Sequence, residues 1–174
     1  MLALRIPDTR EFMKKLLTET VFDSFIVSEA SVTTFTVIRI DGSWHPEYFD
    51  DEETDEDDRK EESGNAAKES ALSWGRLRPV FFGIIRGRRT PGAFRLVFRL
   101  AGYNVASLLS GSGLNIRPEE VAGLFLNISF SGGEVSCTTG TSMNTFTLDQ
   151  TLNHLWDELV QKFLRQQKIP FTVL

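Results

Sequence analysis

The stretch from Trp74 to Leu100, WGRLRPVFFGIIRGRRTPGAFRLVFRL, constrains the fold of this chain most, because it is rich in both apolar residues and arginine. From position 94 onward the two kinds of residue alternate: Phe94, Leu96, Phe98 and Leu100 fall on one face of an extended chain, and Arg95, Val97 and Arg99 fall on the other. Alternation with a period of two is typical of a strand with one face on a core and the other in solvent. The sequence therefore predicts a half-buried strand here.

A continuous apolar run, VFFGII at residues 80–85, comes just before this strand. Its β-branched and aromatic residues favour a second strand, covered on both faces. The intervening residues 86–92, RGRRTPG, contain two glycines and a proline, which are turn-forming residues. We therefore predict a hairpin with an arginine-rich turn.

The charge pattern of this region points to an anionic partner. Between Ser70 and Pro118 there are eight arginines, no lysine and no acidic residue. Arginine presents a planar fork of donors that matches phosphate and carboxylate groups. The alternative is that these arginines are solvated and pair with acidic residues of the same chain. The candidate anion- or nucleic-acid-binding residues are Arg86, Arg88, Arg89, Arg95 and Arg99.

An acidic segment precedes the arginines. Twelve acidic residues lie between Asp41 and Glu62, although the whole chain has a net charge of only −5. Such a dense run of like charge repels itself, which predicts a surface loop at about residues 43–70. The carboxylates lack the order of a calcium-binding loop, so we predict no metal site. One hypothesis is that this loop neutralises the arginines and competes with an anionic partner.

The remaining patterns predict an α+β fold with a mostly antiparallel sheet, two short helices and a longer C-terminal helix. A chain of 174 residues is long enough for one domain with its own core, so we expect a single domain over residues 1–174. The predicted helices are 9–18, with Asp8 as its N-cap, 103–110 and one from residue 149 onward. The further predicted strands are 2–6, 25–30, 33–40, 124–130, 134–139 and 145–148, with the join between the second and third strands near Ser31.

Few residues offer catalytic chemistry. The single cysteine, Cys137, excludes an internal disulfide and fits a reducing cytoplasm, and no segment has the length of a membrane span. We therefore expect a cytoplasmic protein with no membrane partner and no cofactor. A dyad of Cys137 and His154 is the enzymatic alternative, although an inward cysteine usually acts as a small apolar residue. The hydroxyl-rich residues 138–142 fit either a polar pocket or a strand-end turn.

The order of elements suggests an internal duplication. Strand, helix, strand, strand and strand occur twice, in half-repeats 1–86 and 93–148, before the closing helix. This order resembles the domain of DNA sliding clamps, which implies helices that face DNA and carry basic residues. The second predicted helix has no basic residue, so the resemblance covers the clamp-like shape and not its function. The first helix does carry basic residues: Arg10, Lys14 and Lys15.

Four phrases carry a second resemblance: EASVTTFTVIRIDG, RGRRTPGAFRLVF, GLFLN and SCTTGTSMNTFTLDQTLNHLWDE. They resemble a family of uncharacterised bacterial proteins known only as a domain of unknown function, which implies a bacterial protein and supplies no activity. From the residues we expect a non-enzymatic binding module that contacts an anionic partner, such as DNA, through its arginines. The alternatives are a protein-interaction or self-associating scaffold domain that pairs through sheet edges, and an enzyme that uses Cys137.

Overall fold

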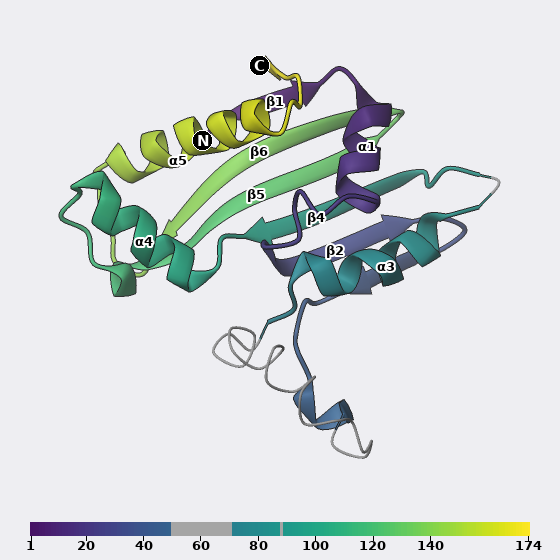
Figure 1. Cartoon of the computed structure of the whole chain (residues 1–174), viewed down its shortest axis with the longest axis horizontal. Coiled ribbons are helices and arrows are strands. Elements are labelled where there is room, and N and C mark those ends of the chain that lie inside the picture. The colour runs from purple at the N-terminus through teal and green to yellow at the C-terminus, as the bar shows by residue number, and fades with distance from the viewer. Residues whose placement is uncertain (50–70, 88) are drawn as a thin grey trace.

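The computed structural model describes residues 1–49, 71–87 and 89–174 of the chain (Figure 1). The elements follow in the order β1 (Ala3–Ile6), α1 (Thr9–Leu17), β2 (Ile26–Thr33), β3 (Val37–Ile40), the 3-10 helix η1 (Pro46–Phe49), α3 (Trp74–Ile85), β4 (Ala93–Arg99), α4 (Gly102–Ser112), the 3-10 helix η2 (Pro118–Glu120), β5 (Val121–Ser131), β6 (Glu134–Met143), α5 (Thr151–Gln166) and β7 (Thr172–Val173).

The strands form one seven-stranded sheet in the order β3-β2-β4-β5-β6-β1-β7, and each neighbouring pair is antiparallel. Figure 1 shows α1, α3 and α5 on one side of this sheet, with α4 beside α5 at its end. The predicted α+β class with a mostly antiparallel sheet is confirmed. We call the side of the sheet under the helices the covered face and the opposite side the open face.

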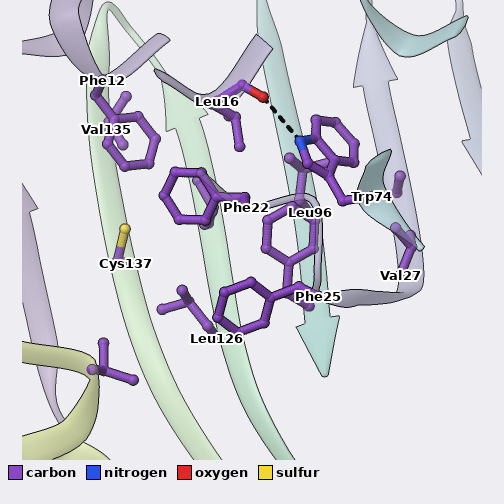
Figure 2. Close-up of a cluster of buried hydrophobic side chains, with 14 of the residues drawn as sticks. Phe12, Leu16, Phe22, Phe25, Val27, Trp74, Leu96, Leu126, Val135 and Cys137 are labelled. Atoms are coloured by element: carbon purple, nitrogen blue, oxygen red, sulfur yellow. Dashed lines mark hydrogen bonds between the residues drawn. The ribbon is translucent and has the colours of Figure 1, made fainter. Parts of the chain in front are cut away.

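The core lies between the covered face and the helices. In β4 the predicted alternation holds, with Phe94, Leu96 and Phe98 buried. The rings of Phe22 and Phe25 contact the ring of Phe98, with centroids 6.0 and 5.7 Å away. Figure 2 shows Phe22 and Phe25 of this cluster below the end of α1. There the Trp74 indole N–H donates a hydrogen bond to the Leu16 carbonyl. Burial of this many aromatic rings, at roughly 1.5–3 kcal/mol for each, fixes the helices on the sheet.

The prediction of a strand at residues 80–85 is wrong, because these residues belong to α3. The buried residues of α3 recur with a helical period, at Trp74, Leu77, Phe81 and Ile85. A run of six apolar residues does not distinguish a buried strand from a helix. The helical period extends back to Trp74, but the arginines in residues 74–79 make that part of the pattern look polar. Pro79 lies inside the helix and removes one backbone hydrogen bond. Residues 86–92 therefore connect a helix to a strand and do not form a hairpin turn.

Other boundaries also differ from the prediction. The turn between the second and third strands lies at residues 34–36, where the Thr34 N–H donates to the Thr36 carbonyl at 2.9 Å, and not at residue 31. The predicted strand at 145–148 lies in a loop, since β6 ends at Met143. The first helix begins as predicted, with the Asp8 carboxylate accepting the N–H of Glu11 at 3.0 Å. The capping residue could therefore be identified from sequence, whereas the strand ends could not.

The repeat of elements takes a different form from the predicted one. Among the described elements, strand, helix, strand, strand and helix occur twice, and β7 follows. The two halves are not equivalent in the sheet, because β1 pairs with β6 and β7 whereas its counterpart β4 pairs with β2 and β5. The helix α3 takes the place of the last predicted strand of the first half, whereas the last predicted strand of the second half, residues 145–148, is a loop.

Candidate functional site

One line of residues crosses the open face from edge to edge. Residues directly opposite each other in antiparallel strands point to the same face. The registers of the six strand pairs therefore join seven side chains into a continuous line, which we call the arginine row: Arg39, Ser31, Arg95, Ser129, Ser136, Arg5 and Thr172. Three arginines thus alternate with short hydroxyl side chains on the uncovered side of the sheet.

The geometry of the sheet sets the spacing of these arginines. Neighbouring strands lie about 4.8 Å apart, so the Cα atoms of Arg39 and Arg95 are about 10 Å apart and those of Arg95 and Arg5 about 14 Å apart. The serines between them are too short to cover the guanidinium groups. The row therefore presents three cations at intervals along a polar surface.

Two of the three arginines have no partner in the described part of the chain. Arg39 and Arg95 are exposed, and neither forms an ion pair or a side-chain hydrogen bond with a described residue. Arg5 lies 3.6 Å from Glu134, with both side chains more than half exposed. An exposed ion pair of this kind contributes roughly 0–1 kcal/mol to stability. An anion that binds Arg5 more tightly than Glu134 does can therefore displace Glu134.

An aromatic side chain stands on the same face, near the other end of β4 and β5. In the register of the sheet, Phe125 of β5 lies opposite Arg99 of β4 on one side and Gly140 of β6 on the other. A Cβ atom built on Gly123 would lie 2.6 Å from the Phe125 ring and 3.2 Å from the Arg99 Cδ. The absent side chain at Gly123 thus lets the ring lie over β5 beside the Arg99 side chain. Among the strand residues of the open face that the structure describes, Phe125 is the one aromatic residue.

The open face is positive although the chain is acidic. Its described strand residues include the four arginines Arg5, Arg39, Arg95 and Arg99, but only two acidic residues, Glu29 and Glu134. Such a local excess of positive charge attracts anions even when the net charge of the protein is −5.

The structure divides the predicted site residues between two places. Arg95 and Arg99 lie on the open face, whereas Arg86 and Arg89 lie in the connection between α3 and β4. A hydrogen bond of 2.9 Å from the Gly92 N–H to the Thr33 carbonyl holds this connection against the end of β2. The fifth predicted residue, Arg88, lies outside the described residues, as does most of the predicted acidic loop.

Three other arginines of the same region form internal contacts. Arg78 donates from Nε and Nη2 to the two carboxylate oxygens of Asp23, both at 2.8 Å, and these hydrogen bonds raise the pKa of Arg78. The Arg76 guanidinium lies 4.4 Å from the centre of the Trp44 ring. Arg117 Nη2 donates to Glu120 at 3.0 Å. Internal pairing thus accounts for these three arginines, and the partners differ from the predicted acidic run.

Sequence reasoning missed Arg5 and Arg39. The signal was present, because ALRI and VIRI alternate apolar and arginine residues as β4 does. However, residues 5, 39 and 95 are far apart in the chain, and only the order of strands in the sheet brings them into one row. Local alternation predicts which face a residue occupies, but not which residues share a row.

The proposed dyad is not assembled. Cys137 is buried on the covered face of β6, and burial raises the pKa of its thiol to about 12. The thiolate is the reactive form of cysteine, and it is scarce at neutral pH when the pKa is this high. His154 lies on the exposed side of α5, and no hydrogen bond joins it to Cys137.

The hydroxyl-rich residues of β6 line a small polar pocket, in agreement with one of the two interpretations of the sequence. The cavity has a volume of about 170 Å³, and its walls include Thr139, Thr141, Asn153 and Asp157. Thr139 donates to Asp157, Thr141 donates to Asn153, and the Leu2 N–H donates to Thr139 at 2.8 Å. These bonds hold α5 and the residue before β1 against β6. The polar groups that line the pocket are therefore already hydrogen-bonded to one another or to the backbone.

Two further properties bear on the site. Within residues 1–49, 71–87 and 89–174, no group of three or more histidine, cysteine, aspartate or glutamate residues is placed to hold a metal ion. In the same part of the chain, no helix combines the length and the apolar character that crossing a bilayer requires.

Residues 15–172 match the family of unknown function DUF5721, and the chain belongs to this family. No curated protein and no solved structure matches the chain. The resemblance of the element order to sliding clamps therefore has no support from known proteins. The family supplies no activity, so function has to be argued from the open face.

Proposed function

We propose that this member of the family of unknown function binds single-stranded nucleic acid on the open face of its sheet. The observation that carries the proposal is the arginine row, which places Arg39, Arg95 and Arg5 in one line across the sheet. A nucleic-acid strand carries phosphates at regular intervals, and arginine binds phosphate through two parallel hydrogen bonds. A line of separated arginines fits such a repeating anion better than it fits one small anion.

The position of the arginine row on the broad side of a sheet favours a single strand over a duplex. Reading a duplex requires an element that enters a groove, usually a helix or a two-stranded ribbon. The open face is the broad side of a seven-stranded sheet, which cannot enter a groove as a helix or a two-stranded ribbon does. Proteins that bind single strands on a sheet combine basic residues with an aromatic ring on which a base stacks. Phe125 supplies such a ring and Arg99 a basic side chain beside it.

The strength of binding follows from the number of phosphate contacts. Three to four arginine contacts predict that log K falls with log salt concentration with a slope of about −2 to −3, at about 0.7 per contact for a single strand. The open face has few groups that could read base edges, so we expect little sequence preference and a dissociation constant in the micromolar range, roughly 10⁻⁶–10⁻⁴ M. The proposal is thus a weak, electrostatic and general binding activity.

Fluorescence anisotropy tests the proposal directly. The probes are a labelled single-stranded DNA of about 20 nucleotides, long enough to span the face, and a duplex of the same length. The single strand should bind more tightly than the duplex, and the double variant Arg39→Ala/Arg95→Ala should bind it about tenfold more weakly at low salt. The control is Arg10→Ala/Lys162→Ala, which removes the same charge from exposed positions on α1 and α5. An equal loss in both double variants would show that only net charge matters.

A further inference from the structure

A small cavity lies on the open face around Arg5, the last arginine of the row. Its volume is about 170 Å³, and its lining includes Arg5 of β1, Ser129 and Ser131 of β5, and Ser136 of β6. The register explains this grouping, because Ser136 lies opposite Arg5 on one side and Ser129 on the other. Ser131 lies two positions farther along β5 and therefore on the same face. One guanidinium and three hydroxyl groups thus share one cavity.

Internal bonds do not occupy these hydroxyl groups. None of the three serine side chains forms a hydrogen bond with a described residue. This cavity differs from the polar pocket beside α5, where Thr139 and Thr141 donate to side chains of the helix. Hydroxyl and guanidinium groups all donate hydrogen bonds, and a guanidinium also carries positive charge. The cavity is therefore suited to an oxyanion.

The volume fits a single phosphate group. A water-sized group occupies roughly 30 Å³ of a liquid, so a cavity of about 170 Å³ holds about five such groups. A phosphate has five heavy atoms, whereas a whole nucleotide has several times as many. The cavity can therefore take a phosphate while the attached sugar and base remain outside it.

We infer that this cavity binds the terminal phosphate of a nucleic-acid single strand, an inference that rests on the proposed function. A terminal phosphate carries a charge of about −1.5 to −2 at neutral pH and three free acceptor oxygens. An internal phosphate carries a single charge and two free oxygens. Three hydroxyl groups and a guanidinium can supply a donor to every oxygen of the terminal group. The donor set thus matches the end of a strand better than its interior.

The place of the cavity in the row agrees with this assignment. Beyond Arg5 the row contains only Thr172, on the two-residue edge strand β7. Leu174, which follows β7, forms part of the cavity wall and offers no charged or hydroxyl side chain to a further phosphate. A strand that crosses the face from Arg39 over Arg95 therefore meets the cavity where the row ends.

Glu134 opposes binding and sets its strength. Among the described residues that line the cavity, it is the one with a negative charge, and it forms the ion pair with Arg5. Both side chains are more than half exposed, so the carboxylate can turn into solvent at little cost. Binding then exchanges this ion pair for an arginine–phosphate pair with two parallel hydrogen bonds.

Fluorescence anisotropy with three internally labelled strands of one sequence tests the inference. The first strand has a phosphate at its five-prime end, the second at its three-prime end, and the third has hydroxyl groups at both ends. One phosphorylated strand should bind about tenfold more tightly than the hydroxyl strand, as expected for hydrogen bonds to a charged group. The other should bind like the hydroxyl strand, because the cavity lies at only one end of the row.

An equal gain for both ends is what added charge alone would give, and it overturns the inference. The absence of any gain overturns it as well. Binding of the hydroxyl strand in either case leaves the proposed function standing, so the two failures are distinguishable.

Two pairs of variants locate the phosphate. Ser136→Ala should reduce the preference for the phosphorylated strand severalfold, because it removes a donor without changing the charge. Ser31→Ala is the matched control, since Ser31 is also a half-buried serine of the arginine row but lies outside the cavity. Glu134→Gln should increase this preference, whereas Glu29→Gln, which removes the other carboxylate of the open face, should not. Equal effects within either pair overturn the inference, and circular dichroism confirms the fold of each variant.

Inorganic phosphate tests the cavity without a strand. At millimolar concentrations it should shift the amide resonances of Arg5 and residues 129–136 and leave those of Ser31 and Arg39 unchanged. Shifts at the cavity without binding of any strand would overturn the proposed function and keep the cavity as a phosphate site. No shift at the cavity would overturn the inference, whether or not the strands bind.

Discussion

Arg78 and Asp23 form a two-pronged ion pair in which Nε and Nη2 of the arginine each donate to one carboxylate oxygen at 2.8 Å. The side chains are only 18% and 25% exposed, and the pair joins α3 to the turn that precedes β2. Close by, the Trp74 Nε1 donates to the Leu16 carbonyl at 2.9 Å, which ties the start of α3 to the end of α1. These polar contacts position a helix that the apolar run alone did not reveal.

Removing one partner of this ion pair should destabilise the protein. Arg78→Ala leaves Asp23 half-buried without its hydrogen bonds, so we expect the free energy of unfolding to fall by about 1–3 kcal/mol. Arg78→Lys should restore only part of this loss, because lysine lacks the planar fork. Urea denaturation of the three proteins measures the differences. A full rescue by lysine would mean that charge alone matters at this position.

Replacing Pro79 should stabilise the protein. Proline inside a helix removes a hydrogen bond and crowds the preceding turn, whereas alanine favours the helix, so Pro79→Ala should raise the free energy of unfolding by about 1–2 kcal/mol after the entropy gained by the unfolded chain. Pro118→Ala is the control, because Pro118 starts the 3-10 helix η2, where proline is tolerated. Thermal unfolding of the wild type and both variants measures the change in stability. If residues 80–85 were a strand, Pro79→Ala would bring no such gain.

The buried Cys137 thiol should make the folded protein less stable at high pH. Its pKa is raised by burial to about 12, whereas the thiol of the unfolded chain ionises near its ordinary value of 9.0. Between these values the folded state keeps the proton that the unfolded state releases, so rising pH favours unfolding. The expected contribution is at most about 1.4 kcal/mol for each pH unit above 9, and none at neutral pH.

The variant Cys137→Ala isolates this contribution. It should be less stable than the wild type at neutral pH, because it leaves a small cavity, but it should lose less stability between pH 9 and 11. Equal slopes for the two proteins would contradict a buried, protonated thiol. Alkylation by iodoacetamide offers a second check, since the native thiol should react only on unfolding.

The position of the Phe125 ring can be tested by adding one methyl group. In Gly123→Ala the new Cβ would lie 2.6 Å from the ring, so the ring must move from its place over β5. We expect the affinity for the single strand to fall severalfold, because a base would lose its stacking platform, worth roughly 1–3 kcal/mol. Gly140→Ala is the matched control, because its Cβ would lie at an ordinary 3.8 Å from Phe125, and it should bind like the wild type.

The features that the sequence predicts are those with a clear local period. The alternation in β4 correctly places Arg95 and Arg99 opposite the buried Phe94 and Phe98, and the Asp8 cap correctly marks the start of α1. These patterns depend only on neighbours in the chain. The α+β class follows because several such strands and helices occur together.

The features that sequence reasoning missed depend on distant residues. Residues 80–85 were predicted as a strand because the helical period of α3 becomes visible only when Trp74 and Leu77 are counted with Phe81 and Ile85. The arginine row was missed because Arg5, Arg39 and Arg95 come from three strands whose order in the sheet is set by tertiary packing. The arginine-rich connection drew attention to Arg86 and Arg89, whereas the open face gathers its arginines from the whole chain.

The most direct test of the account is the salt dependence of single-strand binding by wild type, Arg39→Ala/Arg95→Ala and the control Arg10→Ala/Lys162→Ala. If the arginine row contacts phosphates, the first variant should lose about 1.4 from the slope of log K against log salt concentration, at about 0.7 for each lost contact. The control should keep the wild-type slope. Equal slopes for all three proteins, or no binding by the wild type at low salt, would contradict the assignment of nucleic-acid binding to the open face.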